Sequence, residues 1–177
     1  EARVCGVRPA MPVTEARRRC PQGVLLPGNR RRYSEVSRVV MHTLGQFSPL
    51  VEPASIDEAY VDITGTETLF GPPETLARAI KEAVRRATGL ACSVGVAPVK
   101  FIAKISSDYD KPDGLTIVSP EDALDFLAPL PVGKIPGVGK RAEETLARLG
   151  IRTIADIRKH PPDFLARHCG KYGLALY

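Results

Sequence analysis

The chain has 177 residues, enough to bury one hydrophobic core or two small ones. Hydrophobic residues make up 44% of it and charged residues 25%, which is ordinary for a soluble globular protein. No apolar run approaches the length of a membrane-spanning helix and no signal peptide opens the chain, so we expect a cytoplasmic protein without a membrane partner. The four scattered cysteines and three histidines show no metal-ligand spacing, which predicts reduced thiols.

The net charge of +5 is unevenly distributed along the chain. Residues 1–40 carry nine basic and three acidic side chains, residues 41–118 carry seven and ten, and residues 119–177 carry nine and seven. An acidic middle between basic ends is typical of a metal-binding centre between surfaces that meet phosphates. A solvated charged surface without such a function is the alternative.

The first 50 residues predict two helices and one strand. Residues 13–20 form a short helix that stops at Pro21, and residues 23–26 form a short apolar strand. A longer helix follows, because five apolar residues recur at helical spacing: Tyr33, Val36, Val40, Leu44 and Phe47.

Strands and helices then alternate up to Val118. We expect three strands, at residues 56–63, 90–97 and 115–118. The first contains a turn, and the second is a nearly continuous apolar run that should be central. Two helices separate them, one ending at Gly89 and one running from Pro98 to about Tyr109. This order predicts an α+β fold with a ferredoxin-like, antiparallel or mixed sheet and helices on one face.

The character of the sequence changes after Ser119-Pro120. Short helices separated by Pro and Gly dominate from there to Tyr177, which predicts a small all-α domain. One helix should run from Lys140 to Leu149, and Thr153 with an Asp three residues later predicts the start of the next.

Asp57 and Glu58 interrupt an otherwise apolar strand pattern. In a regular strand they would point to opposite faces, and Asp57 would share its face with Ala59, Val61 and Ile63. An ionised Asp there is costly unless it is paired, and a bound Mg²⁺ would pair with it. A bend near Asp57 would instead swing both carboxylates to one side. Two solvated acids at a strand edge are the alternative.

The stretch from Ser55 to Asp62 resembles the acidic signature of the Y-family DNA polymerases, in their DinB-like, translesion branch. The resemblance implies that Asp57 and Glu58 hold two catalytic Mg²⁺ ions, with Mn²⁺ as a substitute. These ions would serve nucleotidyl transfer from a dNTP to a primer 3′-hydroxyl. It also implies low-fidelity synthesis and lesion bypass in DNA damage tolerance.

Three lysines, Lys100, Lys104 and Lys111, follow at helical spacing. The run from Gly95 to Gly114 resembles the family's palm helix and the turn after it, which implies that Lys111 contacts the phosphates of the incoming nucleotide. For Lys100 and Lys104, a role at the phosphates and a solvated helix face both remain open. An ordinary type I or II turn is the alternative for Lys111.

The first twelve residues resemble the end of the family's fingers. The resemblance implies that Arg3 contacts the triphosphate, a role that suits a guanidinium fork. It also implies that the small Ala10 roofs the nascent base pair and leaves room for damaged templates. A frayed terminal side chain is the alternative for Arg3.

A glycine-rich hairpin precedes the helix that starts at Lys140. Gly137 and Gly139 flank Val138 and allow a tight turn with close approach of the backbone to a partner. Exposed N–H groups at the helix start can hold a phosphate without reading sequence. The motif resembles the helix-hairpin-helix of non-specific DNA binders, Y-family thumbs included, and implies DNA contacts by these four residues. A mere connector between helices is the alternative.

The resemblance divides the chain into the end of the fingers (residues 1–29), the palm (30–118) and the thumb (119–177). The family's first palm strand, with a further metal-binding Asp, and its last DNA-binding domain are missing from the sequence, so we expect this chain to be inactive alone. The expected partners are primer–template DNA, a dNTP and a sliding clamp contacted through a missing C-terminal region. We expect a monomer.

Two other functions fit parts of the pattern. A non-catalytic DNA-binding relative of the family is disfavoured because Asp57 and Glu58 are both present. A different palm enzyme, such as a nucleotide cyclase, is disfavoured by the helix-hairpin-helix.

Overall fold

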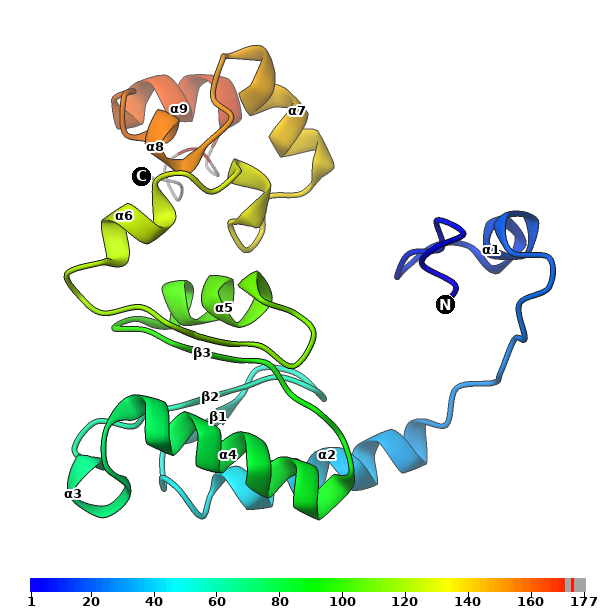
Figure 1. Cartoon of the computed structure of the whole chain (residues 1–177). Coiled ribbons are helices and arrows are strands. Elements are labelled where there is room, and N and C mark those ends of the chain that lie inside the picture. The colour runs from blue at the N-terminus through cyan, green and yellow to red at the C-terminus, as the bar shows by residue number, and fades with distance from the viewer. Residues whose placement is uncertain (171–172, 174–177) are drawn as a thin grey trace. The chain divides into compact units, whose positions relative to one another are not determined.

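The computed structural model describes residues 1–170 and 173. They fall into two compact units, Glu1–Ser34 and Glu35–Tyr177. Figure 1 labels the helices and strands along the chain. Among the described residues, no helix is both long enough and apolar enough to cross a lipid bilayer.

Helix α1 (Val13–Arg19) is the main element of the first unit and ends one residue earlier than predicted. Glu15 pairs with Arg19 one turn later, at 2.7 Å, which supports this short helix. The strand predicted at residues 23–26 is wrong. This stretch is a loop in which Val24 is 84% and Leu26 83% exposed. A strand needs a partner for its backbone groups, and no strand among the described residues pairs with it.

Helix α2 (Arg30–Leu44) begins in the first unit and ends in the second. Its apolar stripe confirms the predicted periodicity in the second half of the helix, where Val40 and Leu44 pack into a core. Tyr33 at the start is 54% exposed, and Phe47 follows the helix in a turn.

The strands form two small sheets instead of one. In the first, β1 (Val51–Pro53) pairs antiparallel with β2 (Ala59–Val61). In the second, β3 (Val94–Val96) pairs in parallel with β4 (Leu115–Ile117). The strands are shorter than predicted, because residues 55–57 bend and residues 90–93 have no partner strand among residues 1–170 and 173.

Helix α4 (Pro73–Thr88) packs against β3 and β4 of the second sheet, and the short α3 (Glu67–Phe70) packs against α4. The buried face of α4 also shares a core with Val51, Ala59 and Val61 of the first sheet. A proline at its first position and a left-handed Gly89 after its end set the bounds of α4. Its buried residues Leu76, Ile80 and Val84 recur at helical spacing and form a core with Leu44. The predicted helix and its stop are confirmed.

Helix α5 (Lys100–Tyr109) packs closely on β3. The contact requires Gly95, because a Cβ there would lie 2.2 Å from the carbonyl oxygen of Ala103. Ile102 also meets Ala123 of α6 (Ala123–Leu127), and the rings of Tyr109 and Phe126 touch edge to face, 5.3 Å apart.

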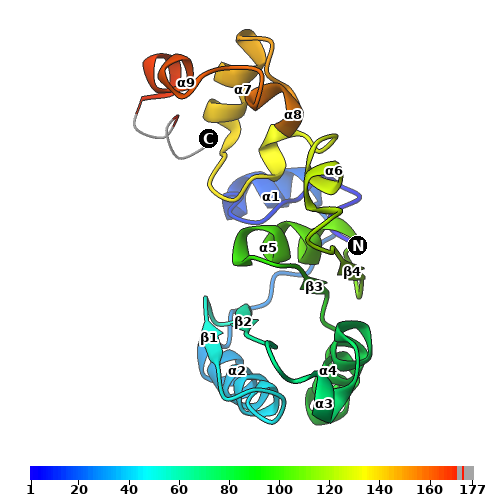
Figure 2. The same ribbon diagram turned by 90° about the vertical axis from the view of Figure 1, so that its left-hand side faces the viewer.

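The remaining described elements are helical: η1 (Val132–Lys134), α7 (Lys140–Arg148), α8 (Ile154–Ile157) and α9 (Pro162–Cys169). Figure 2 shows α7, α8 and α9 gathered together. Leu146, Ile151 and Leu165 at their centre are completely buried. Thr153 and Asp156 form the predicted cap at the start of α8. The prediction of helix beyond Gly170 lies outside the described residues, except at Gly173.

The predicted fold class is therefore confirmed. The chain is α+β, with small strands and many helices up to Val118; after it, the described residues form helices and one isolated bridge between Pro131 and Thr153.

Candidate active site

Asp57 and Glu58 lie where the chain turns from β1 into β2. The backbone N–H groups of Ala54 and Ser55 both donate to the carbonyl oxygen of Glu58, at 2.9 and 3.1 Å, and close a tight loop. Within the loop the Ser55 hydroxyl donates to Asp57 Oδ1 at 2.7 Å. The bend takes Asp57 out of the strand alternation, so its side chain is exposed instead of sharing the core face of Val61.

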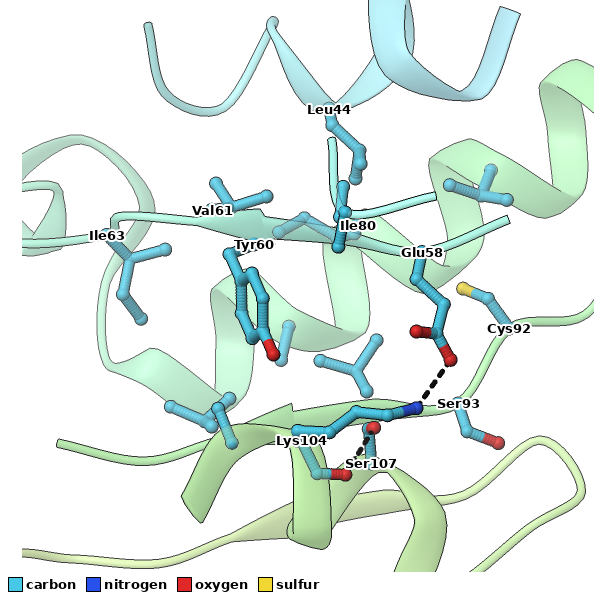
Figure 3. A pocket seen from close by; sticks show the side chains of 18 of the residues that line it. Leu44, Glu58, Tyr60, Val61, Ile63, Ile80, Cys92, Ser93, Lys104 and Ser107 are labelled. Atoms are coloured by element: carbon cyan, nitrogen blue, oxygen red, sulfur yellow. Dashed lines mark hydrogen bonds and ion pairs between the residues drawn. The ribbon is translucent and has the colours of Figure 1, made fainter. Parts of the chain in front are cut away.

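Both carboxylate residues border one cavity of about 230 Å³. The cavity lies between β2 and β3, and each of these strands pairs on only one side within the described residues. Its walls are mostly apolar and come from α2, α4 and both strands (Figure 3). Glu58 and Lys104 bring charge to it, one from the turn before β2 and the other from α5.

Four charged side chains form a continuous chain from the β1–β2 turn to the turn that follows α5. Lys104 Nζ lies 2.5 Å from Glu58 Oε1 and 3.0 Å from Asp108 Oδ2. Asp108 Oδ1 in turn lies 2.5 Å from Lys111 Nζ. The chain alternates in sign, so each charge has an opposite charge beside it.

The two inner members of this chain have shifted pKa values. Partial burial alone would lower the pKa of Lys104, but its hydrogen bonds to Glu58 and Asp108 outweigh that and hold the pKa above its usual value. Partial burial would likewise raise the pKa of Asp108, but the two lysines lower it. Lys104 is therefore protonated and Asp108 is ionised at neutral pH.

Lys111 stands in a turn that is anchored from α4. The ammonium of Lys81 donates to the carbonyl oxygens of Cys92 and Asp113 and to the Asp113 carboxylate, at 2.7–2.8 Å. The Lys81 and Arg85 charges hold the pKa of Asp113 below its usual value, with the Lys81 hydrogen bond as the largest cause. The turn has a cis Lys111–Pro112 peptide, and Asp113 has a φ of 53°.

Lys100 is separate from the charged chain. It pairs with Glu52 on β1 and lies 5.6 Å from the centre of the Tyr60 ring. The structure thus distinguishes the two lysines that the sequence left open, since only Lys104 reaches a predicted site residue.

Arg3 and Ala10 both lie in the first unit and are exposed. The carbonyl oxygen of Arg3 accepts from the N–H of Gly6 at 3.0 Å and from the Arg8 guanidinium at 3.5 Å. Ala10 has a φ of 62°, a backbone conformation that is rare for residues other than glycine. Their predicted contacts to nucleotide and base pair remain predictions.

The hairpin before α7 presents backbone to solvent. Gly137 has a φ of 92°, which favours glycine, and Gly139 occupies the N-cap of α7 without a side-chain cap. Val138 turns inward and packs against the helical core, whereas Gly137, Gly139 and Lys140 are exposed. The geometry suits an anion held by the first N–H groups of α7.

Asp108, Lys81 and Asp113 were missed by the sequence reasoning. Asp108 had a detectable signal, because it lies four residues after Lys104 and three before Lys111. Lys81 and Asp113 are 32 residues apart and had none.

The oxygen donors at the turn are of the kind that Mg²⁺ prefers. Asp57 and Glu58 alone are too few, and the described part of the chain holds no cluster of three or more acidic, His or Cys residues suited to a metal ion. The residues present therefore fit part of a divalent-metal site.

The structure combines two adjacent acids at the edge of a cavity with a glycine hairpin before α7. The sequence profile of the impB/mucB/samB family matches residues 1–108, and the profile of the IMS family HHH motif matches residues 120–151. The chain belongs to the impB/mucB/samB family, and the predicted resemblance to Y-family, DinB-like polymerases is confirmed.

Curated relatives are named DNA polymerase IV. The relative from Desulfatibacillum aliphaticivorans is 44% identical over 177 residues, which are 100% of this chain and 45% of that protein. The relative from Methanoculleus marisnigri is 46% identical over 100% of this chain and 49% of that protein. The chain spans about half the length of the curated relatives that it matches.

Solved structures agree over nearly the whole chain. DinB from Sulfolobus solfataricus matches with a TM-score of 0.91 and 36% identity, over 99% of this chain and 52% of that one. An insertion ternary complex of Dbh DNA polymerase matches with a TM-score of 0.88 and 36% identity, over 99% and 52% of the two chains.

Proposed function

We propose that the protein is a translesion-type, DNA-templated DNA polymerase that transfers a nucleotide from a dNTP to a primer 3′-hydroxyl. The observation that carries this proposal is the placement of Asp57 and Glu58 at the edge of one cavity, where Glu58 is connected to Lys111 through Lys104 and Asp108. Relatives named DNA polymerase IV, and a neighbour described as an insertion ternary complex of a DNA polymerase, support it.

Asp57 and Glu58 are proposed to hold Mg²⁺, or Mn²⁺, as two ions in the complete enzyme. Such ions, when bound, activate the primer hydroxyl and neutralise the triphosphate and the departing pyrophosphate. In this chain Lys111 is exposed and anchored through its turn, so it can meet a triphosphate as a point charge. By the resemblance to the family, Arg3 would contact the triphosphate, a role that suits its guanidinium fork.

The cavity offers a place for the family's first palm strand and its further metal-binding Asp. β2 and β3 border the cavity and, among the described residues, each pairs on one side only. One added strand could hydrogen-bond to both and bring a third carboxylate to Asp57 and Glu58. Without it, we expect residues 1–177 to be inactive.

The remaining assignments follow the family. Residues 1–29 would belong to the fingers, with Ala10 over the nascent base pair, residues 30–118 to the palm and residues 119–177 to the thumb. The thumb would grip primer–template DNA through Gly137, Val138, Gly139 and Lys140. We propose a cytoplasmic monomer with a sliding clamp as a further partner and lesion bypass as its role.

Primer extension by the full-length protein tests this function. We expect Mg²⁺-dependent extension that Asp57→Ala or Glu58→Ala lowers by several orders of magnitude, because neither change leaves two acidic ligands. Glu52→Gln is the matched control, since Glu52 is an exposed acid of the same hairpin that pairs with Lys100 instead. Unchanged extension in both Ala variants, or DNA binding by the wild type without extension, would refute a catalytic role and favour a non-catalytic DNA-binding relative.

A further inference from the structure

Two residues without an assigned role, Lys104 and Asp108, connect the proposed metal ligand Glu58 to the proposed nucleotide ligand Lys111. Glu58 touches Lys104, Lys104 touches Asp108, and Asp108 touches Lys111, at 2.5, 3.0 and 2.5 Å. The outer members are thus occupied by charges that resemble their proposed ligands. A cation lies on Glu58, and an anion lies on Lys111.

We propose that Lys104 stands in for the metal ion at Glu58 and Asp108 for the nucleotide phosphate at Lys111, and that both give way when the substrates bind. This inference rests on the proposed function. It makes Lys104 and Asp108 positioning residues that exchange partners during substrate binding.

The distance between the two stand-ins supports an exchange over a simple loss of pairing. They lie one turn apart on α5 and are already in contact, so they can pair with each other when Glu58 and Lys111 change partners. No charge is then left alone in either state. The Lys104 side chain is only 24% exposed, so an ammonium without a partner would be costly there.

The exchange predicts opposite effects from one substitution. Asp108→Asn removes the competitor of the nucleotide at Lys111, so the nucleotide dissociation constant should fall about threefold, as expected for a partly exposed ion pair. The same change removes the second partner of Lys104 and strengthens its hold on Glu58. The Mn²⁺ dissociation constant should therefore rise by about the same factor.

Both constants are measured on the full-length protein with a dideoxy-terminated primer–template, which prevents chemistry. Free Mn²⁺ is followed by electron paramagnetic resonance without nucleotide, and dATP binding is followed opposite a template thymine. Asp110→Asn is the matched control, because it removes the same charge from an exposed residue that forms no ion pair within the described chain. It should change each constant less than twofold.

Substitution of Lys104 tests the other half of the exchange. Lys104→Gln should lower the Mn²⁺ dissociation constant about threefold, because no ammonium competes for Glu58. Lys100→Gln is its control, since Lys100 pairs with Glu52, and should shift that constant less than twofold. In the Lys104→Gln background, Asp108→Asn should no longer weaken Mn²⁺ binding, because its effect passes through Lys104.

The outcomes separate the two proposals. If the wild type binds Mn²⁺ and dATP but Asp108→Asn behaves like Asp110→Asn, the partner exchange is wrong and the proposed function stands. Weakening of both ligands together, with a lower melting temperature, would show a merely structural role and also overturns the exchange. If the wild type binds neither ligand, the proposed function fails and the exchange fails with it.

Discussion

The two halves of the second unit close their cores in different ways. The helical part has one core in which Leu146, Ile151 and Leu165 are fully buried, with the capping box of Thr153 beside it. The α/β part has two separate sheets with a cavity of about 230 Å³ between them. The part with the proposed DNA contacts therefore has one closed hydrophobic core, whereas the part with the proposed reaction centre has a cavity between its two sheets.

The cavity between the two sheets is unfavourable for folding as long as no other group covers its apolar walls. Apolar residues that line it, such as Val61, Ile63 and Val94, are only partly buried, so they leave apolar surface in contact with water. We therefore expect the α/β half to be more sensitive to substitution than the helical half. Three substitutions test the difference between the halves.

Gly95→Ala should have the largest effect on folding. A Cβ at Gly95 would lie 2.2 Å from the Ala103 carbonyl and 2.4 Å from the Ser107 amide, so β3 and α5 would have to separate. We expect a loss of about 3 kcal/mol or more in the free energy of unfolding, measured by urea denaturation. Gly139→Ala in the helical half is the control, because nothing lies within 4 Å of its Cβ. Equal losses in both variants would contradict the proposed tight contact.

Lys81→Met should have an intermediate effect. It removes the ammonium that ties α4 to the Lys111 turn and leaves the Cys92 and Gly114 carbonyl oxygens without it. We expect a loss of about 2 kcal/mol in urea unfolding. Arg78→Met on the same helix breaks only an exposed pair with Glu74 and should cost less than about 0.5 kcal/mol. If the two variants unfold alike, Lys81 does not anchor the turn.

Lys140→Gln should have the smallest effect. It removes a single proposed phosphate contact from the surface of the helical part and leaves the buried core unchanged. The affinity for primer–template should fall a few-fold, and the salt dependence of log K should weaken by about one unit of slope. Fluorescence anisotropy over a range of NaCl concentrations measures both. Arg148→Gln at the opposite end of α7 is the matched control. An unchanged slope for Lys140→Gln would place the DNA contact elsewhere.

The sequence predicted the helices better than the strands. Helices α4 and α7 are set by local signals, namely apolar spacing and the proline and glycines at their ends. The strand predicted at residues 23–26 was apolar enough, but neither it nor residues 90–93 pairs with a strand in the part of the chain that the structure describes. Strand pairing depends on segments that are distant in sequence, so local pattern cannot decide it.

The same limit applies to the site. Asp57 and Glu58 were found because acids inside an apolar run are unusual, and the bend that the sequence allowed is present. The contact of Glu58 with Lys104 spans 46 residues and could not be read from spacing. Lys100 and Lys104 looked equivalent on a helix, and only the fold shows that they face different acids.

The central claim is that a metal binds at Asp57 and Glu58, and iron-mediated cleavage tests it most directly. Fe²⁺ in place of Mg²⁺, with ascorbate and peroxide, cuts the backbone near the bound ion. For the full-length protein we predict cuts beside Asp57 and Glu58 and along the neighbouring end of α5, and their loss in the Asp57→Asn, Glu58→Gln double variant. Cuts that persist in the double variant, or that cluster in the helical half near His160 and His168, would contradict the account.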